Sequence, residues 1–191
     1  MKPFLAVVVF LLVAASATAQ DSKFELFGGY QFLHAGSFDG LGDSANTNGW
    51  GSAATVNFSH HLGLTADFGG SYKTESVELT GVTGTAAVRV YTYAVGPTVS
   101  TRSGNIRLFA HALFGGAHVR PTGCVIFSGS PDECGSGSAT GFSMLIGGGV
   151  DMRAGKSAAV RLVQCDWIRL PSQFGAQNGN VRLSAGLVFH F

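Results

Sequence analysis

Histidines are the side chains of this sequence best suited to metal binding or proton transfer. His60 and His61 are adjacent, and no pair of histidines has the close spacing of a zinc motif. Ordinary turn and interior histidines are therefore favoured, and no metal or other cofactor is expected. His34 and His118 fall near the same end of their segments and form the one pair worth testing with a metal. The six histidines are His34, His60, His61, His111, His118 and His190.

The cysteines point to a covalent cross-link. Cys124 and Cys134 flank the stretch VIFSGSPDE, and in an exported protein a disulfide between them would persist. Closing so small a ring stabilises the folded chain by roughly 3 kcal/mol at most. Two free thiols are the alternative. Cys165 is then left over as a small strand residue.

The first residues of the sequence indicate export. Lys2 is followed by the apolar run FLAVVVFLLVAA and by small residues at Ala17 and Ala19, which is the pattern of a cleaved secretory signal peptide. We expect residues 1–19 to be that peptide and residues 20–191 to form one domain. Losing Lys2 takes the formal net charge from +1 to 0, which argues against a basic nucleic-acid-binding surface.

The composition is unusual for a protein that meets water on its whole surface. Hydrophobic residues make up 46% of the chain and charged residues 12%, about half the charged share of a typical soluble domain. Beyond the signal peptide the apolar residues are spread over short alternating segments. This profile is typical of a transmembrane barrel whose outer face meets lipid. The 28 glycines would let a small barrel bend and close.

Eight segments alternate with the period of two expected of β-strands. In the last one, VRLSAGLVFHF, the residues Leu187, Phe189 and Phe191 share an apolar face. Two registers are open. Arg89 in the fourth segment has the same parity as its tyrosines, a conflict that a bulge would remove, and the charged residues of the seventh segment disagree in parity. The segments are 23–33, 49–59, 62–73, 85–100, 105–119, 141–153, 157–170 and 181–191.

The connections between these segments are alternately long and short. The long ones follow the first, third, fifth and seventh segments, so they share one rim of the predicted structure. In outer-membrane barrels the long loops lie outside the cell, while the short turns and both termini lie in the periplasm. The sequence therefore predicts an all-β, eight-stranded antiparallel up-and-down transmembrane β-barrel with four extracellular loops. The long connections are 34–48, 74–84, 120–140 and 171–178.

Charged residues within the segments are expected to fill the interior. An eight-stranded barrel has room inside for side chains alone, and a buried charge is very costly unless it is paired. Four acids opposite four arginines would form a self-neutralising network, and removing one partner, as in Arg107→Ala, should destabilise the barrel. The predicted members are Glu25, Asp67, Asp151 and Asp166 with Arg89, Arg107, Arg161 and Arg182.

Four stretches of the sequence, FGGYQF, YAVGPTVS, VQCDW and LVFHF, resemble strands of the small outer-membrane β-barrel family that includes the OmpA-type transmembrane domain. The resemblance covers the whole mature chain. It implies residence in the outer membrane of a Gram-negative-type bacterium, contact with its lipids, and recognition of the last strand by the barrel assembly machinery. By this resemblance, Leu187, Phe189 and Phe191 are the residues that the assembly machinery is expected to recognise. No periplasmic domain follows the segments, so the resemblance does not extend to peptidoglycan anchoring.

The favoured function is a non-enzymatic, monomeric barrel with a structural or surface-interaction role, whose loops contact an extracellular ligand or a host surface. A small pore and a lipid-modifying outer-membrane enzyme are the alternatives. Such an enzyme would need serine and histidine together near the outer leaflet, whereas the contiguous pair Ser59 and His60 falls in a short periplasmic turn. A soluble lipocalin-type carrier would need a polar outside, which the low charged share disfavours.

Overall fold

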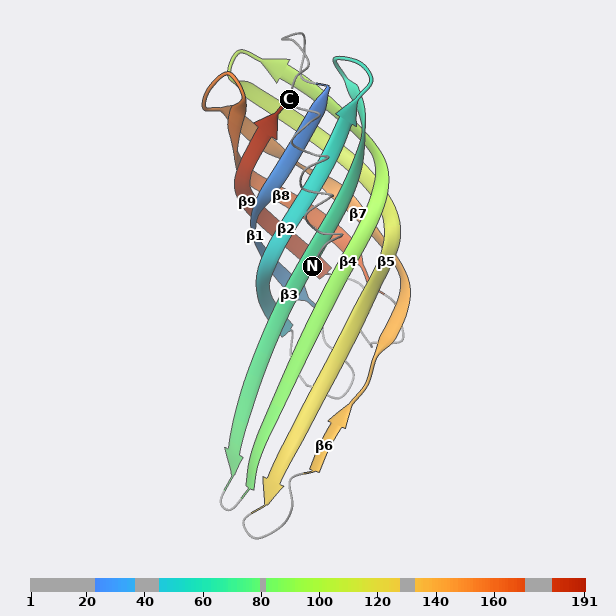
Figure 1. The fold of residues 1–191 in the computed structure, drawn as a ribbon, viewed down its shortest axis with the longest axis vertical. Helices are drawn as coiled ribbons and strands as arrows, with labels where there is room; N and C mark the ends of the chain where they lie inside the picture. The colour runs from blue at the N-terminus through green and yellow to red at the C-terminus, as the bar shows by residue number, and fades with distance from the viewer. Residues whose placement is uncertain (1–22, 37–44, 80–81, 128–132, 171–179) are drawn as a thin grey trace, which may run out of the picture.

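The computed structural model describes residues 23–36, 45–79, 82–127, 133–170 and 180–191. Within these ranges the chain is all-β and forms nine strands (Figure 1). No helix in the described ranges is long and apolar enough to cross a membrane. The strands are β1 (Phe24–Ala35), β2 (Ala45–Asn57), β3 (Leu62–Leu79), β4 (Val82–Ser103), β5 (Ile106–Phe127), β6 (Glu133–Ser136), β7 (Ala139–Arg153), β8 (Ala158–Arg169) and β9 (Asn180–His190).

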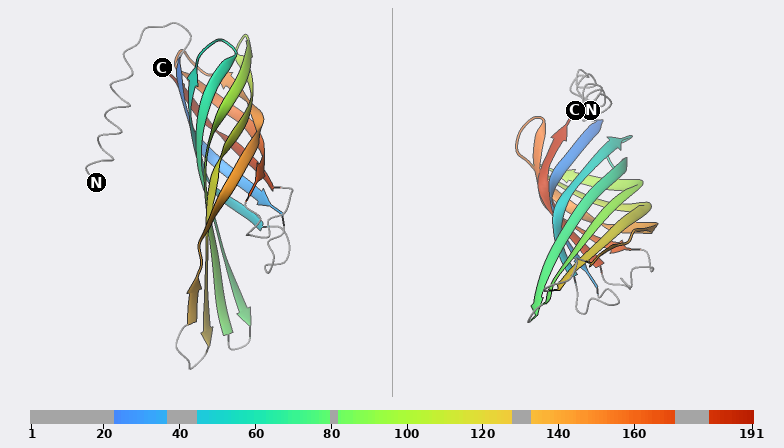
Figure 2. Two further views of the ribbon diagram at one scale, coloured as in Figure 1. Left: turned by 90° about the vertical axis from the view of Figure 1, so that its right-hand side faces the viewer. Right: turned by 60° about the horizontal axis from the view of Figure 1, so that its bottom comes forward.

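Eight of the nine strands close into a barrel, which is visible in Figure 1 and Figure 2. Consecutive strands pair antiparallel around the ring, β4 pairs with β5, β5 with β7, and β9 returns to β1. At the closing seam Phe191 donates its backbone N–H to the carbonyl of Phe24 at 2.9 Å. The structure thus confirms the predicted eight-stranded antiparallel barrel.

Alternate residues of each strand face outward and inward, because the side-chain period of a strand is two. The outer face carries large apolar side chains such as Phe58 (71% exposed) and Phe142 (62%). Leu187, Phe189 and Phe191 also lie on this face. The inner face is largely polar in the middle of the barrel, where Arg182 and Asp166 are among the most buried side chains.

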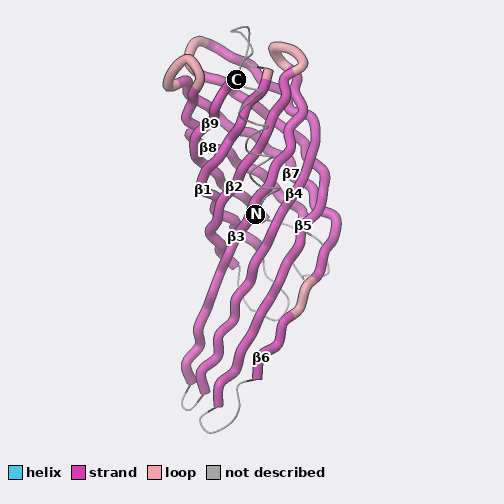
Figure 3. Tube along the Cα trace, in the orientation of Figure 1, coloured by secondary structure: helices cyan, strands magenta, loops and turns pink. Residues whose placement is uncertain are grey.

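Two of the four expected long loops are instead largely β-structure. The pairing of β3 with β2 stops at Tyr72. The pairing of β3 with β4 continues beyond it, as far as Leu79 and Val82. β5 runs to Phe127, and its far end pairs with β6. We call the resulting extension the blade; it comprises residues 73–79, 82–88, 121–127 and 133–136. Figure 3 shows it projecting from one side of the barrel rim, opposite the short turns.

The residues of the blade explain why it pairs. The stretch between 74 and 88 is rich in threonine and valine, residues that favour a pleated strand, and a hairpin aligns them. Of the other two expected loops, residues 37–44 and 171–179 lie outside the described residues, as does the expected signal peptide.

The structure settles both open strand registers. β4 keeps one register with β3 from Val99 to Val82, so the bulge expected in the fourth segment is wrong. In β8 the pairing with β9 shifts between Arg161 and Gln164. This bulge turns Leu162 and Val163 outward together, and it allows Arg161 and Gln164 both to point inward despite their opposite parities.

Glycines make room for the polar interior at two inward positions. A Cβ on Gly69 would lie 2.7 Å from Oε1 of Gln31. A Cβ on Gly147 would collide with Oδ1 of Asp166. Both are contacts that only glycine permits, so the close approach of backbone and polar side chains depends on these two residues.

Candidate functional site

Arg182 is the centre of the polar interior. Its Nη1 and Nη2 atoms donate to the two carboxylate oxygens of Asp67 at 2.7 and 3.0 Å. Its Nε and Nη2 atoms donate to Oδ2 of Asp166 at 2.9 and 2.7 Å. The side chain of Arg182 is 1% exposed. One guanidinium therefore bridges two buried carboxylates from β3 and β8 with charge-assisted hydrogen bonds, of which the pair to Asp67 is bidentate.

A second arginine continues the network. Arg161 donates from Nε and Nη2 to the oxygens of Asp151 at 2.7 and 3.1 Å, and from Nη1 to Gln164 at 2.6 Å. Its guanidinium carbon lies 4.3 Å from the ring centroid of Phe27 and 4.2 Å from that of Phe109. The cation is thus held between two aromatic faces as well as by a carboxylate.

Gln164 joins the two arginine clusters, since its amide also donates to Oδ2 of Asp166 at 2.7 Å. At the end with the short turns, Arg107 forms an ion pair with Glu25 and lies 3.8 Å from Asp151. The charged groups therefore form one connected chain from the turn end of the barrel to Asp67. Acidic and basic side chains alternate along this chain of contacts, so each buried charge has an opposite charge beside it.

The structure brings together seven of the eight predicted interior charges and places Arg89 elsewhere. Arg89 is exposed on the outer face, because β4 keeps an unbroken register in which Arg89, Tyr91 and Tyr93 all point outward. The predicted balance of four acids and four arginines is therefore wrong. Four acids face three arginines inside.

His111, rather than Arg89, contacts one of the interior acids. Its Nε2 lies 2.8 Å from Oδ1 of Asp166, and a neutral imidazole with its proton on Nε2 can donate there. Gln31 is a further member that the charges alone did not indicate. It donates to Ser71 at 2.8 Å and accepts from Arg182 at 3.4 Å. Both residues have inward parity in their strands, so alternation alone places them in the interior.

An apolar layer closes the interior on the blade side of the network. Its members are all buried, come from β1, β4, β5, β7, β8 and the residue that follows β8, and contact one another as a cluster. The predicted interior network consists of charged residues alone and does not include them. They are Leu33, Ala94, Leu113, Ala117, Leu145, Ile168 and Leu170.

Little free volume is left beside the network. A space bordered by Asp67, Arg107 and Arg161 measures about 10 Å³, which is room for one water molecule at most. A larger cavity of about 250 Å³ lies at the turn end, and Ser59, His60, His61 and Arg102 are among the residues that line it.

The serine and histidines of that cavity organise a turn. Ser59 Oγ accepts the backbone N–H groups of His61 at 3.3 Å and of Leu62 at 3.1 Å. The imidazole Nδ1 of His61 lies 3.0 Å from the carbonyl oxygen of Ser100. The hydroxyl of Ser59 is therefore engaged as a turn acceptor, at the end of the barrel away from the blade.

His34 and His118 are not brought together. Nδ1 of His34 lies 2.7 Å from Asn46, and Nδ1 of His118 lies 2.6 Å from Thr140. They stand on β1 and β5, which are not neighbours in the barrel. Within the described residues no group of three or more histidine, cysteine or acidic side chains could hold a metal ion.

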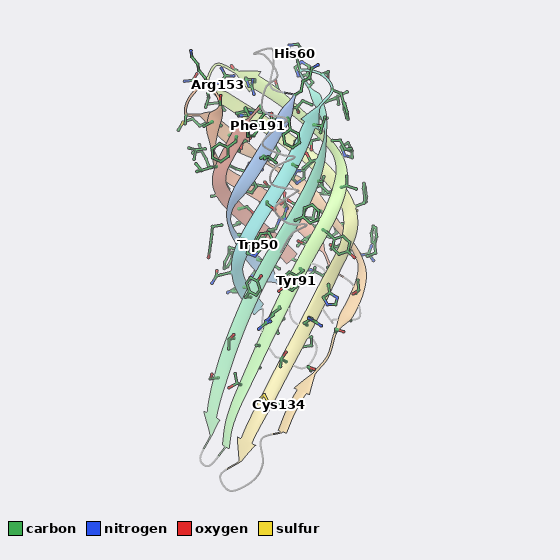
Figure 4. All side chains as sticks on the ribbon, in the orientation of Figure 1. Trp50, His60, Tyr91, Cys134, Arg153 and Phe191 are labelled. Atoms are coloured by element: carbon green, nitrogen blue, oxygen red, sulfur yellow. A yellow bond between two sulfur atoms is a disulfide. The ribbon has the colours of Figure 1, made fainter. Side chains whose placement is uncertain are left out.

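The predicted disulfide is present and lies in the blade. Cys124 and Cys134 are bonded, with Cα atoms 4.1 Å apart, and they face each other in the β5–β6 register. Cys165 is a free cysteine on the outer face of β8. Figure 4 shows Cys134 well below the barrel, on the extension.

Solved structures share this fold. The attachment invasion locus protein Ail of Yersinia pestis matches with a TM-score of 0.61 and 16% identity, over 90% of this chain and 100% of that one. Ail in complex with the heparin analogue sucrose octasulfate matches with a TM-score of 0.58 and 14% identity, over 90% and 100%. Neisserial surface protein A matches with a TM-score of 0.58 and 14% identity, over 91% and 100%.

No protein-family model matches the sequence, and no curated protein matches it. The structural matches nevertheless agree in architecture over nearly the whole chain. The chain therefore has the fold of the small eight-stranded outer-membrane β-barrels.

Proposed function

We propose that this chain is a non-enzymatic integral outer-membrane protein that presents the blade outside the cell for contact with an extracellular ligand or surface. The observation that carries the proposal is the blade itself: four paired strands that extend past the closed barrel and are cross-linked by Cys124–Cys134. A disulfide persists only in an oxidising setting, which fits exposure beyond the cytoplasm.

The outer face supports residence in a membrane. Large apolar side chains are exposed on every barrel strand, among them Leu62 at 54% and Leu108 at 50%. A water-soluble monomer rarely shows so continuous an apolar surface. Lipid is the partner that this band requires, and the low charged share of the sequence agrees with it.

The orientation follows from the two unlike ends of the barrel. We infer that the short turns lie in the periplasm and the blade outside, after export directed by residues 1–19 and their removal. Assembly by the outer-membrane barrel machinery and a monomeric state belong to the same proposal. Ail, whose structure holds a sucrose octasulfate, illustrates that a barrel of this fold can present a ligand site.

Epitope tags test location and orientation together. One variant carries a tag within 128–132, between β5 and β6, and a matched variant carries the same tag at Gly155 in the β7–β8 turn. Antibody should label intact cells that carry the first variant and label the second only after the outer membrane is permeabilised. Recovery of both proteins from the soluble periplasm, or labelling of the turn on intact cells, would contradict the proposal.

The pore alternative predicts a different electrical behaviour. Because the interior is occupied by the Arg182 and Arg161 clusters and by the apolar layer, the purified protein in planar bilayers should show no steady conductance of porin size. A porin recorded in the same bilayers is the positive control. A stable large open channel would refute the plugged interior and favour the pore.

Opening the disulfide should loosen the blade and leave the barrel intact. A loss of about 1.4 kcal/mol corresponds to a tenfold change in an equilibrium, and the ring can contribute up to roughly 3 kcal/mol. The double variant Cys124→Ser/Cys134→Ser should therefore be cut by trypsin after Lys73, at the base of the blade, at least about tenfold faster. Cys165→Ser is the matched control. Unchanged cleavage of the double variant would show that the disulfide does not hold the blade.

A further inference from the structure

Two arginines lie side by side on the outer face where the barrel meets the blade. Arg89 of β4 and Arg120 of β5 are direct partners in the register, and both are exposed. Like charges directly opposite one another on a sheet repel and destabilise the pair. No hydrogen bond or ion pair joins either guanidinium to a side chain that the structure describes. An external anion placed between the two guanidinium groups would relieve this repulsion.

The interior arginines show the contrast. Arg107, Arg161 and Arg182 each face at least one carboxylate. The barrel thus neutralises its buried arginines with its own acids, whereas Arg89 and Arg120 are left with uncompensated positive charge on the membrane-facing side.

The residues beside the pair mark the level of the membrane surface. Tyr72 is the register partner of Arg89 on the other side, and Tyr91 stands two residues along β4 toward the short turns. The rings of Tyr72 and Tyr91 meet edge to face with centroids 5.9 Å apart, and Trp50 donates its indole N–H to the Tyr72 hydroxyl at 3.2 Å. Tyrosine and tryptophan with paired polar tips form the aromatic girdle of a barrel at the lipid–water boundary.

The belt continues around this side of the barrel. Tyr30 donates to Asn48 at 2.6 Å, and Tyr91 is paired in register with His118. Figure 4 shows Trp50 and Tyr91 near the place where the blade leaves the barrel, with Arg153 at the opposite end. Arg89 lies two residues beyond Tyr91 on β4, about 7 Å along the strand at ~3.4 Å per residue, and opposite Tyr72 at the outer edge of this belt. That is the depth of lipid headgroups.

We propose that Arg89 and Arg120 bind a phosphate group on the headgroup of an outer-leaflet lipid, with the acyl chains of that lipid lying against Tyr72 and Tyr91. Arginine donors match phosphate oxygens in a bidentate manner, and one phosphate placed between the two guanidinium groups would turn their repulsion into attraction. The inference rests on the proposed function, because it requires the blade end of the barrel to face the outer leaflet.

Lipid retention by the purified protein tests the site. The protein is extracted in mild detergent, mixed with bisphosphorylated lipid A, and analysed by native mass spectrometry. Wild type should retain the lipid, and Arg89→Gln/Arg120→Gln should retain it at least about tenfold less, since hydrogen bonds to charged groups carry effects of that size. The matched control, Arg153→Gln/Lys156→Gln, removes the same charge from two exposed residues at the turn end and should retain it like wild type.

Two further arms use wild type alone and so do not depend on the folding of a variant. Lipid A from which both phosphates have been removed should not be retained. Inorganic phosphate at millimolar concentration should not displace the bound lipid, because the acyl chains add contacts that the free ion lacks. Equal retention of dephosphorylated lipid, full displacement by inorganic phosphate, or unchanged retention by the arginine double variant would each overturn the site. If retention fails while the tag experiment still places the blade outside, the lipid site is wrong and the proposed function stands.

Discussion

Replacing Arg182 with methionine should lower the free energy of unfolding of the barrel by about 3–5 kcal/mol, the usual result of removing one partner of a buried ion pair. Methionine keeps much of the side-chain length but donates no hydrogen bond. Asp67 and Asp166 would then be two buried carboxylates without their shared cation, and four hydrogen bonds of 2.7 to 3.0 Å would be lost. Urea unfolding in lipid bilayers, followed by tryptophan fluorescence, measures the change.

Two comparisons identify the cause. The triple variant Arg182→Met/Asp67→Asn/Asp166→Asn removes the stranded charges together with the arginine, so it should recover most of the lost stability. Arg153→Met removes an exposed arginine and should change stability by less than about 0.5 kcal/mol. If the triple variant were no more stable than Arg182→Met, lost packing rather than uncompensated charge would explain the effect.

Arg107→Ala should also destabilise the barrel, but by less than Arg182→Met. Arg107 lines the cavity of about 250 Å³ at the turn end, where solvent can compensate a lone carboxylate. Glu25 would also keep the amide of Asn57, which donates to it at 2.8 Å. The same unfolding assay ranks the two variants, and an equal or larger effect of Arg107→Ala would contradict this ranking.

Alternation was enough to predict the barrel, because each strand is long and has one apolar face that is exposed. The period of two gave the inward position of Asp67 on β3 and of Arg182 on β9, and these residues meet although 115 positions separate them. Cys124 and Cys134 were predictable as a pair from their spacing and their exported setting. The alternation of inward and outward side chains is the same on every strand of a closed sheet, so it can be read from each segment separately.

The errors have equally local causes. Arg89 is expected inside if charge avoids an apolar outer face, whereas it lies outside, opposite Tyr72 at the blade end of that face. The disagreement of parities around Arg161 came from a bulge, which adds one residue that no alternation rule anticipates. The blade was taken for loops because glycine and threonine are common in both, and strand pairing beyond the barrel depends on the partner strand.

The apolar layer was missed for a different reason. Leu113 and Leu145 point inward. Where consecutive residues of a strand are all apolar, the sequence does not show which of the two faces is the inner one. The interior of a plugged barrel needs no uniform polarity, because side chains rather than water fill it. Composition predicted a filled interior, but not which layer would be apolar.

β9 is the strand whose lipid-facing residues should matter most for assembly. It pairs with both β8 and β1, so its placement closes the barrel. Leu187, Phe189 and Phe191 are 50%, 46% and 43% exposed on the outer face, and they therefore add little to interior packing. Phe191 meets the ring of Phe24 with centroids 6.3 Å apart, directly at the closing seam. In the proposed function, the assembly machinery recognises this outward apolar row before the barrel closes, and the row faces lipid afterwards.

The double variant Phe189→Ser/Phe191→Ser should be exported normally yet fail to accumulate in the outer membrane as a heat-modifiable species, because recognition of β9 precedes closure against β1. Leu62→Ser/Val99→Ser is the matched control: these register partners on β3 and β4 are 54% and 50% exposed at the same turn end, so the control loses a similar lipid-facing area away from the seam and should still assemble. The purified Phe189/Phe191 variant should refold from urea into detergent micelles, since its interior network is intact. Equal loss of both double variants from the membrane would assign the effect to lipid contact in general, and normal assembly of the Phe189/Phe191 variant would remove the recognition role of β9.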